Sequence, residues 1–190
     1  MAPLRARIKE EDGFTLPELL VYAVVMTIVL TVVAGLIITT TMTEKTVRTV
    51  FTASTDGQLA ADNVQTGIRN ASAFKLTSPT ATTQLVIARV AHGDAAVNWV
   101  CAAWLYTPAN GGSIRYHESP NLIAAPTAAQ AEDWTALITG ITPSSGTKIF
   151  STTGDQLTIA YEVKAGDDPP ASIKTSAARR VDIGESLPCF

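Results

Sequence analysis

The longest uninterrupted apolar segment of the chain lies near its N-terminus. Residues 19–38 contain no aspartate, glutamate, lysine or arginine, and their polar side chains are two threonines and one tyrosine. Because about twenty residues of α-helix rise about 30 Å, a segment of this length matches the hydrocarbon thickness of a bilayer. The pattern therefore predicts a helix that can span a membrane.

Apolar residues continue at helical spacing beyond the membrane-length segment. They recur in steps of three and four residues, which is the spacing of one buried helix face. We therefore expect the helix to continue as an amphipathic segment over residues 41–76, with Ser78-Pro79 as the stop signal. Its apolar positions are Val47, Val50, Phe51, Ala61, Val64, Ile68 and Ala71.

The apolar runs of residues 77–190 are short and rich in β-branched and aromatic residues, so they predict strands. One short helix is expected over residues 128–138, with Thr127 as its N-cap. The predicted fold class is α+β, in which a long, partly transmembrane N-terminal helix packs by its C-terminal half against one antiparallel β-sheet of a globular domain. Strands are expected at residues 84–89, 98–106, 113–117, 156–164 and 171–179.

A six-residue motif, Gly13-Phe14-Thr15-Leu16-Pro17-Glu18, stands directly before the apolar segment. Gly-Phe-Thr-Leu, one variable position and a glutamate, set against an uncharged span, resemble the type IV prepilin signal. In that family a membrane peptidase cuts after the glycine and methylates the new N-terminal residue. The resemblance implies that residues 1–13 are a prepilin leader, cleaved between Gly13 and Phe14, and that Phe14 is N-methylated.

The same resemblance gives the helix and its first acidic residue a role in assembly. Residues 14–40 would form the hydrophobic half, which first spans the membrane and later lies in a filament core. Glu18 would pair with the N-terminal amine of a neighbouring subunit, in a low dielectric that strengthens the attraction. A second interpretation needs no partner, because the helix dipole stabilises an acid in the first turn. Pro17 is an ordinary helix-start proline, since first-turn amides have no intrahelical acceptor.

The implied function is structural. The chain is similar to minor pilins and pseudopilins, which assemble through their helices into type IV pilus-like filaments for adhesion, motility, DNA uptake or secretion. The implied partners are a prepilin peptidase, other pilin subunits, the pilus assembly machinery and the membrane. The alternative is an uncleaved signal anchor on a single-pass binding or sensor module. Three basic residues in segment 1–13 favour a cytoplasmic N-terminus and an extracytoplasmic C-terminal domain.

The two cysteines, Cys101 and Cys189, lie far apart in the segment expected outside the cell membrane. Oxidising conditions there permit a disulfide between them. The alternative is two unrelated thiols, with Cys101 simply buried in a strand. A pair this widely spaced fits a minor or pilin-like subunit better than a major pilin, whose two cysteines usually lie closer together.

Motifs for catalysis, cofactors and metals are not found in the sequence. The only histidines, His92 and His117, do not stand at the helical spacing of a zinc-binding pair. No Gly-x-Ser-x-Gly elbow or glycine-rich phosphate loop occurs. The formal net charge of −3 gives no signal for a nucleic-acid partner. We therefore expect no enzyme activity, no cofactor and no metal.

Two tryptophans fall in one predicted strand. Trp99 and Trp104 are separated by an odd number of positions, so a regular strand would direct their side chains to opposite faces of the sheet. One is expected in the core, and the other either exposed or covered by a neighbouring segment.

Overall fold

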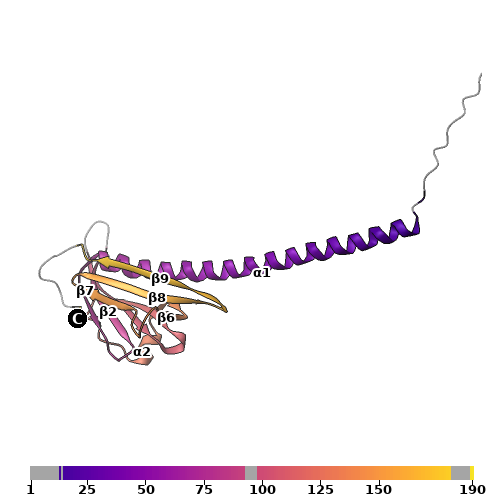
Figure 1. Cartoon of the computed structure of the whole chain (residues 1–190). Helices are drawn as coiled ribbons and strands as arrows, with labels where there is room; N and C mark the ends of the chain where they lie inside the picture. Colours follow the sequence, from indigo (N-terminus) through magenta and orange to yellow (C-terminus); the bar gives the residue numbers. More distant parts are fainter. Residues whose placement is uncertain (1–12, 14, 93–97, 181–188) are drawn as a thin grey trace, which may run out of the picture. The chain divides into compact units, whose positions relative to one another are not determined.

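The computed structural model describes residues 13, 15–92, 98–180 and 189–190. The chain divides into two compact units, Met1–Lys45 and Thr46–Phe190. The first contains the N-terminal part of one long helix, and the second contains the remainder of that helix together with the described strands (Figure 1).

The long helix, α1, runs from Leu16 to Arg69. Threonine hydroxyls along its apolar part donate to backbone carbonyls three or four residues earlier, as Thr27 does to Val24 and Thr31 does to Thr27, both at 2.8 Å. These bonds satisfy the hydroxyls without water, which suits an apolar environment. The predicted fold class, a long apolar N-terminal helix with an antiparallel α+β domain, is confirmed.

The helix ends earlier than its spacing predicts. The amphipathic segment was expected to be helical over residues 41–76, but α1 ends at Arg69 and strand β1 occupies Ala71–Thr77. Phe74 and Leu76 stand at alternate positions and pack against the core, as in a strand. The helical expectation for residues after Arg69 is wrong because pairing with a neighbouring strand overrides local propensity.

Five antiparallel strands form the first sheet, and strands consecutive in the chain are neighbours throughout. A short 3₁₀ turn, η1 (Ala109–Gly111), connects the third strand to the fourth. Antiparallel strands that follow one another along the chain can pair as neighbours without a crossover connection. In sheet order the strands are β1, β2 (Gln84–His92), β3 (Asn98–Thr107), β4 (Ser113–Ser119) and β5 (Thr135–Thr139).

The short helix before β5 is half as long as predicted. Helix α2 covers Ala128–Glu132, and Thr127 caps it as expected, with Gln130 completing a capping box. The helical prediction for residues 133–138 is wrong, because Ala136 and its neighbours pair with β4. Apolar residues near a sheet edge are equally compatible with a strand, so spacing alone did not separate the two.

A second sheet contains four strands, one of which is central and pairs with the other three. Strands β6 and β7 pair with successive parts of one edge of β8, and β9 pairs with the other edge. The expectation of a single sheet is therefore wrong. The chain leaves the first sheet at Gly140, whose φ of +73° is accessible to glycine at little cost. The strands are β6 (Ile141–Pro143), β7 (Phe150–Thr153), β8 (Gln156–Ala165) and β9 (Asp168–Ala178).

One hydrophobic core joins the C-terminal part of α1 to both sheets. Small residues on the helix allow this close packing: a Cβ added to Gly67 would lie 2.3 Å from the Trp104 ring, and one at Gly57 would lie 2.8 Å from Ile173. Buried members of this helix face are Ala53, Ala60, Ala61, Val64 and Ile68.

A second cluster, here called the outer cluster, covers the opposite face of the first sheet. Residues alternate along β2, so that Val86 belongs to the core and Leu85 and Ile87 belong to the outer cluster. Segments outside the sheet cover this second face and keep it from water. The outer cluster consists of Leu85, Ile87, Cys101, Ala103, Leu105, Ile123, Ala131, Trp134 and Cys189.

Candidate functional site

The predicted cleavage site lies just before α1. Gly13 and Thr15 are exposed and precede the helix, whereas Phe14 lies outside the described residues. The first helical hydrogen bond runs from the amide of Leu19 to the carbonyl of Thr15, at 3.1 Å. Gly13 therefore lies N-terminal to the helical hydrogen-bond ladder, and it is exposed.

Glu18 and Pro17 occupy the first turn of α1. The Glu18 side chain is exposed, and the Tyr22 hydroxyl, one turn later, donates to its Oε1 at 3.5 Å. This is a long hydrogen bond, near the limit at which such contacts still contribute. The carboxylate is stabilised by the positive end of the helix dipole and keeps capacity for a stronger, cationic partner.

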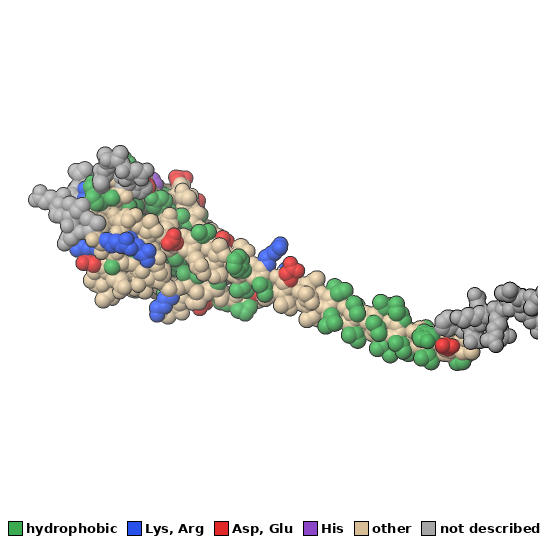
Figure 2. Space-filling model, turned by 90° about the horizontal axis from the view of Figure 1, so that it is seen from above, with side chains coloured by type: hydrophobic (Ala, Val, Ile, Leu, Met, Phe, Trp, Pro, Cys, Tyr) green, Lys and Arg blue, Asp and Glu red, His purple; other side chains and the backbone are tan. Residues whose placement is uncertain are grey.

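The N-terminal part of α1 presents apolar side chains in all directions. Even the least exposed of its large apolar residues, Val33, is 44% exposed. Figure 2 shows these hydrophobic side chains along the helix. An α-helix that is apolar all round belongs in a membrane or in a core built with other chains. By length and composition α1 can cross a membrane.

Apolar exposure also occurs on the helix of the second unit. Val47, Phe51 and Leu59 are 61%, 70% and 64% exposed, respectively, although the opposite helix face is buried in the core. Large side chains at these positions are not required by the fold of the described residues. They extend the apolar surface beyond the membrane-length segment.

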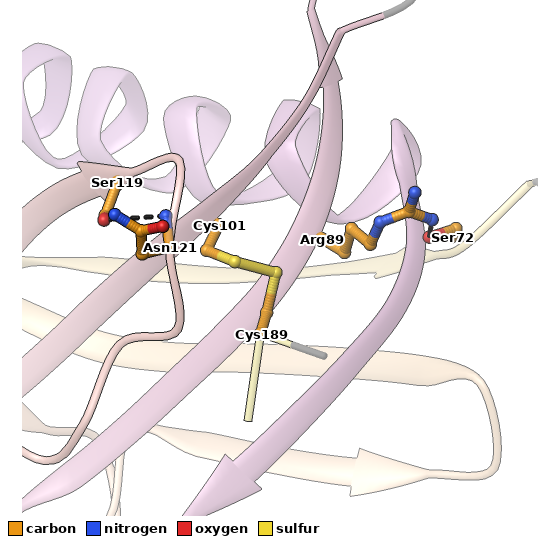
Figure 3. The surroundings of a disulfide bond; sticks show 6 residues. All are labelled: Ser72, Arg89, Cys101, Ser119, Asn121 and Cys189. Atoms are coloured by element: carbon orange, nitrogen blue, oxygen red, sulfur yellow. Dashed lines mark hydrogen bonds between the residues drawn. A yellow bond between two sulfur atoms is a disulfide. The ribbon is translucent and has the colours of Figure 1, made fainter. Parts of the chain in front are cut away.

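The structure joins Cys101 of β3 to Cys189, the pair of cysteines that the sequence offers (Figure 3). Both residues are 4% exposed and belong to the outer cluster. The Ile123 amide donates to the Cys189 carbonyl at 3.2 Å, which gives this chain end a second attachment. The disulfide therefore holds Cys189 against the first sheet.

A buried arginine lies beside the disulfide (Figure 3). Arg89 is 8% exposed, and its Nη1 donates to the Ser72 hydroxyl at 3.2 Å. Its guanidinium carbon lies 4.1 Å from the centre of the Trp99 ring, a cation–π contact. Burial lowers the pKa of Arg89 from its usual value. Trp104 is buried on the core side, so the two tryptophans lie on opposite faces, as predicted.

Of the two histidines, the structure describes the side chain of His117. His117 stacks on Trp134, with ring centres 5.0 Å apart, and the side chain of His92 is outside the described ones. Among the residues searched, no group of three or more histidine, cysteine, aspartate or glutamate side chains is placed to hold a metal ion.

No family model, curated protein or solved structure matches this chain. The candidate site is therefore identified from the residues of this chain alone. These are the accessible Gly13, the first-turn Glu18 and the uncharged, exposed helix that follows them.

Proposed function

We propose that this chain is a type IV pilin-like structural subunit, of the minor pilin or pseudopilin kind. A prepilin peptidase cleaves it after Gly13 and methylates Phe14, and the subunit assembles through α1 into a filament. The carrying observation is the position of Glu18, in the first turn of an apolar helix that has no packing partner within its own described unit.

The exposed helix requires an apolar environment. Burial of one large aliphatic side chain contributes about 1.5–3 kcal/mol, so water is excluded as the resting environment of the segment. A bilayer supplies burial before assembly, and the helices of other subunits supply it afterwards. Transfer between these two environments proceeds without exposing the apolar surface to water.

Glu18 explains how the register of neighbouring subunits is set. A charged carboxylate at the centre of a bilayer costs about 2.5–3.5 kcal/mol, and an opposite charge reduces that cost. Cleavage after Gly13 creates such a charge, the N-terminal amine of a processed subunit. A pair between this amine and Glu18 of a neighbour is strong only when both are desolvated at the right axial position.

The first experiment tests processing. The full chain is extracted from membranes of cells with and without a prepilin peptidase, and the mass of its N-terminal peptide is measured. We expect methylated Phe14 as the first residue only when the peptidase is present, and we expect Gly13→Asp to block cleavage. An intact segment 1–13 in both strains contradicts the proposal and favours an uncleaved, membrane-anchored binding module.

The second experiment tests docking. Glu18→Gln removes the charge while keeping nearly the same shape, and it should leave membrane insertion and cleavage intact but reduce recovery in filaments. Glu44→Gln is the matched control, because Glu44 is an exposed acid on the same helix beyond the apolar segment. Equal filament recovery for the two variants would show that the Glu18 carboxylate interacts only with the dipole of its own helix and not with a neighbouring subunit.

A further inference from the structure

A cavity of about 220 Å³ lies on the outer face of the first sheet, beside α2. Leu105 of β3 and Arg115 of β4 are cross-strand partners, as are Thr107 and Ser113, so all four side chains share this face. Ala131 of α2 lines the cavity from the other side. None of the lining residues belongs to α1, so the cavity is independent of the assembly helix.

The cavity contains one arginine whose position is fixed by the backbone. Nη1 of half-buried Arg115 donates to the carbonyls of Glu132, at 3.0 Å, and Trp134, at 3.1 Å. A guanidinium carries five N–H donors, and these two bonds leave the donors on Nε and Nη2 available. Glu132 offers Arg115 its carbonyl, and no salt bridge between their side chains occurs in the described structure. The positive charge is thus held in place without being neutralised.

A serine lies two residues before Arg115 on the same strand, and its hydroxyl oxygen is not fully buried. Ser113 is 5% exposed and lines the cavity, and within the described part of the chain its hydroxyl makes no hydrogen bond. Five threonines and Asn110 add further polar groups to the lining. Its apolar part comes from proline, alanine and leucine side chains, among them Leu105 and Ala131. An apolar cavity with a few convergent polar groups is the usual form of a small-ligand site.

We propose that this cavity binds a carboxylate carried on a short apolar body. The planar fork of Arg115 matches a carboxylate and forms charge-assisted hydrogen bonds with it. Ser113 donates to the second carboxylate oxygen, and Leu105 and Ala131 contact the apolar part. At about 30 Å³ per water-sized group, the cavity holds roughly seven non-hydrogen atoms. This size suits either a free short-chain acid or the last residue of a peptide.

A ligand of higher charge fits the site less well. A phosphate group carries up to two negative charges, whereas the cavity offers one guanidinium and has the acidic side chain of Glu132 among its lining residues. A carboxylate brings a single negative charge to Arg115, and it is therefore repelled less by Glu132 than a doubly charged phosphate would be. Both the number of cations in the lining and their geometry therefore favour a carboxylate as the ligand.

The test uses the full chain in lipid nanodiscs and ligand-observed NMR titrations. Butyrate represents the free acid and butyramide its neutral isostere, while acetyl-Ala-Ala-Val with a free or amidated C-terminus represents the peptide end. We expect saturable binding of at least one carboxylate and at least about tenfold weaker binding of its amide. Comparison of butyrate with the peptide acid identifies the source of the carboxylate.

Two variants locate binding in the cavity. Arg115→Gln should weaken carboxylate binding by about tenfold or more, whereas Lys148→Gln, which removes the same charge from an exposed position outside the cavity, should leave it unchanged. Because Arg115 also holds two backbone carbonyls, Ser113→Ala provides an independent variant that keeps the guanidinium. It should weaken binding several-fold with an unchanged melting temperature.

Three results would overturn the assignment. Equal affinity for the acid and its amide would show that the charge of Arg115 does not contribute to binding. A lack of saturable binding of either acid up to about 10 mM would show that the cavity is not a carboxylate site, since weak specific complexes have dissociation constants near 1 mM. Unchanged binding by Ser113→Ala and Arg115→Gln together would place the ligand elsewhere.

Discussion

A glycine of α1 lies close against a side chain of the first sheet. Gly67 faces the ring of Trp104, which is 1% exposed and is held by a 2.8 Å hydrogen bond from its Nε1 to Asn63 Oδ1. A ring that is buried and bonded to the same helix cannot rotate away at low cost. Gly67 therefore sets the spacing between helix and sheet.

Gly67→Ala is expected to destabilise the second unit. The added Cβ would lie 2.3 Å from the Trp104 ring, and overpacking of this kind costs about 1–3 kcal/mol, which outweighs a gain in helix propensity of about 1 kcal/mol. Thermal unfolding followed by tryptophan fluorescence measures the change. Gly35→Ala is the matched control, because no atom lies within 4 Å of its added Cβ. A melting temperature unchanged by Gly67→Ala would contradict this account.

Sequence reasoning identified residues whose role is local. The cap at Thr127 and the opposite faces of Trp99 and Trp104 follow from neighbours in the chain and from the two-residue period of a strand. The cavity residue Arg115 could not be identified in this way. Its partners are backbone carbonyls 17 and 19 residues away, and only the pairing of β4 with its neighbours brings them together.

Some ends of helices and strands are set by neighbouring residues in the chain, and others are set by distant ones. The start of α1 could be predicted because Pro17 and the apolar segment mark it locally. Its end, and the conversion of residues 135–139 from expected helix to β5, depend on strands that lie elsewhere in the chain. Helical spacing in a short apolar segment is therefore a weak guide wherever a free sheet edge is nearby.

One buried side chain connects the two sheets. Gln84 of β2 is 1% exposed; its Oε1 accepts from the amides of Ile149 and Phe150, and its Nε2 donates to the Phe150 carbonyl. The three distances are between 2.8 and 2.9 Å, so the amide side chain replaces a strand partner at the start of β7. A glutamine at the end of a strand gave no sequence signal for this role.

Gln84→Met is expected to be strongly destabilising. The side chain keeps a similar length but leaves two backbone amides and one carbonyl unpaired in the core, each costing about 1–3 kcal/mol. Denaturant unfolding of the variant measures the loss, which should exceed about 3 kcal/mol. Gln156→Met serves as the control, because Gln156 is exposed and makes one 3.1 Å bond to Ser176, so its loss should stay within about 0.5 kcal/mol.

The disulfide joins two residues that lie far apart in the chain. Cys189 is 88 residues from Cys101 in the chain, so the bridge closes a long loop of the unfolded state. In the chain-entropy model a loop of this length corresponds to about 4.6 kcal/mol.

Reduction is expected to lower stability without unfolding the sheets. A Cys101→Ala, Cys189→Ala double variant should lose at most about 4.6 kcal/mol and retain its strand content by circular dichroism. Proteolysis should then cut near Cys189 more readily, because the covalent bond from Cys189 to β3 is gone. Equal stability of the variant and the oxidised chain would show that the bridge does not restrain the unfolded state.

The chain divides into two units that differ in their burial. The first unit, Met1–Lys45, contains no buried residue among those described, and its surface is apolar. The second unit, Thr46–Phe190, contains every residue of the core and of the outer cluster. We therefore expect the stability of the second unit to depend little on the environment that covers the first.

A fragment of residues 46–190 is expected to fold without the apolar helix. It keeps the helix face from Ala53 to Ile68, both sheets and the disulfide, so its melting temperature should fall within a few degrees of that of the full chain. Near-ultraviolet circular dichroism and thermal unfolding in detergent-free buffer test this. A fragment that lacks a cooperative transition would show that residues before Thr46 stabilise the domain. Cooperative unfolding would show that the second unit folds without the residues before Thr46, as the proposed assembly through α1 requires.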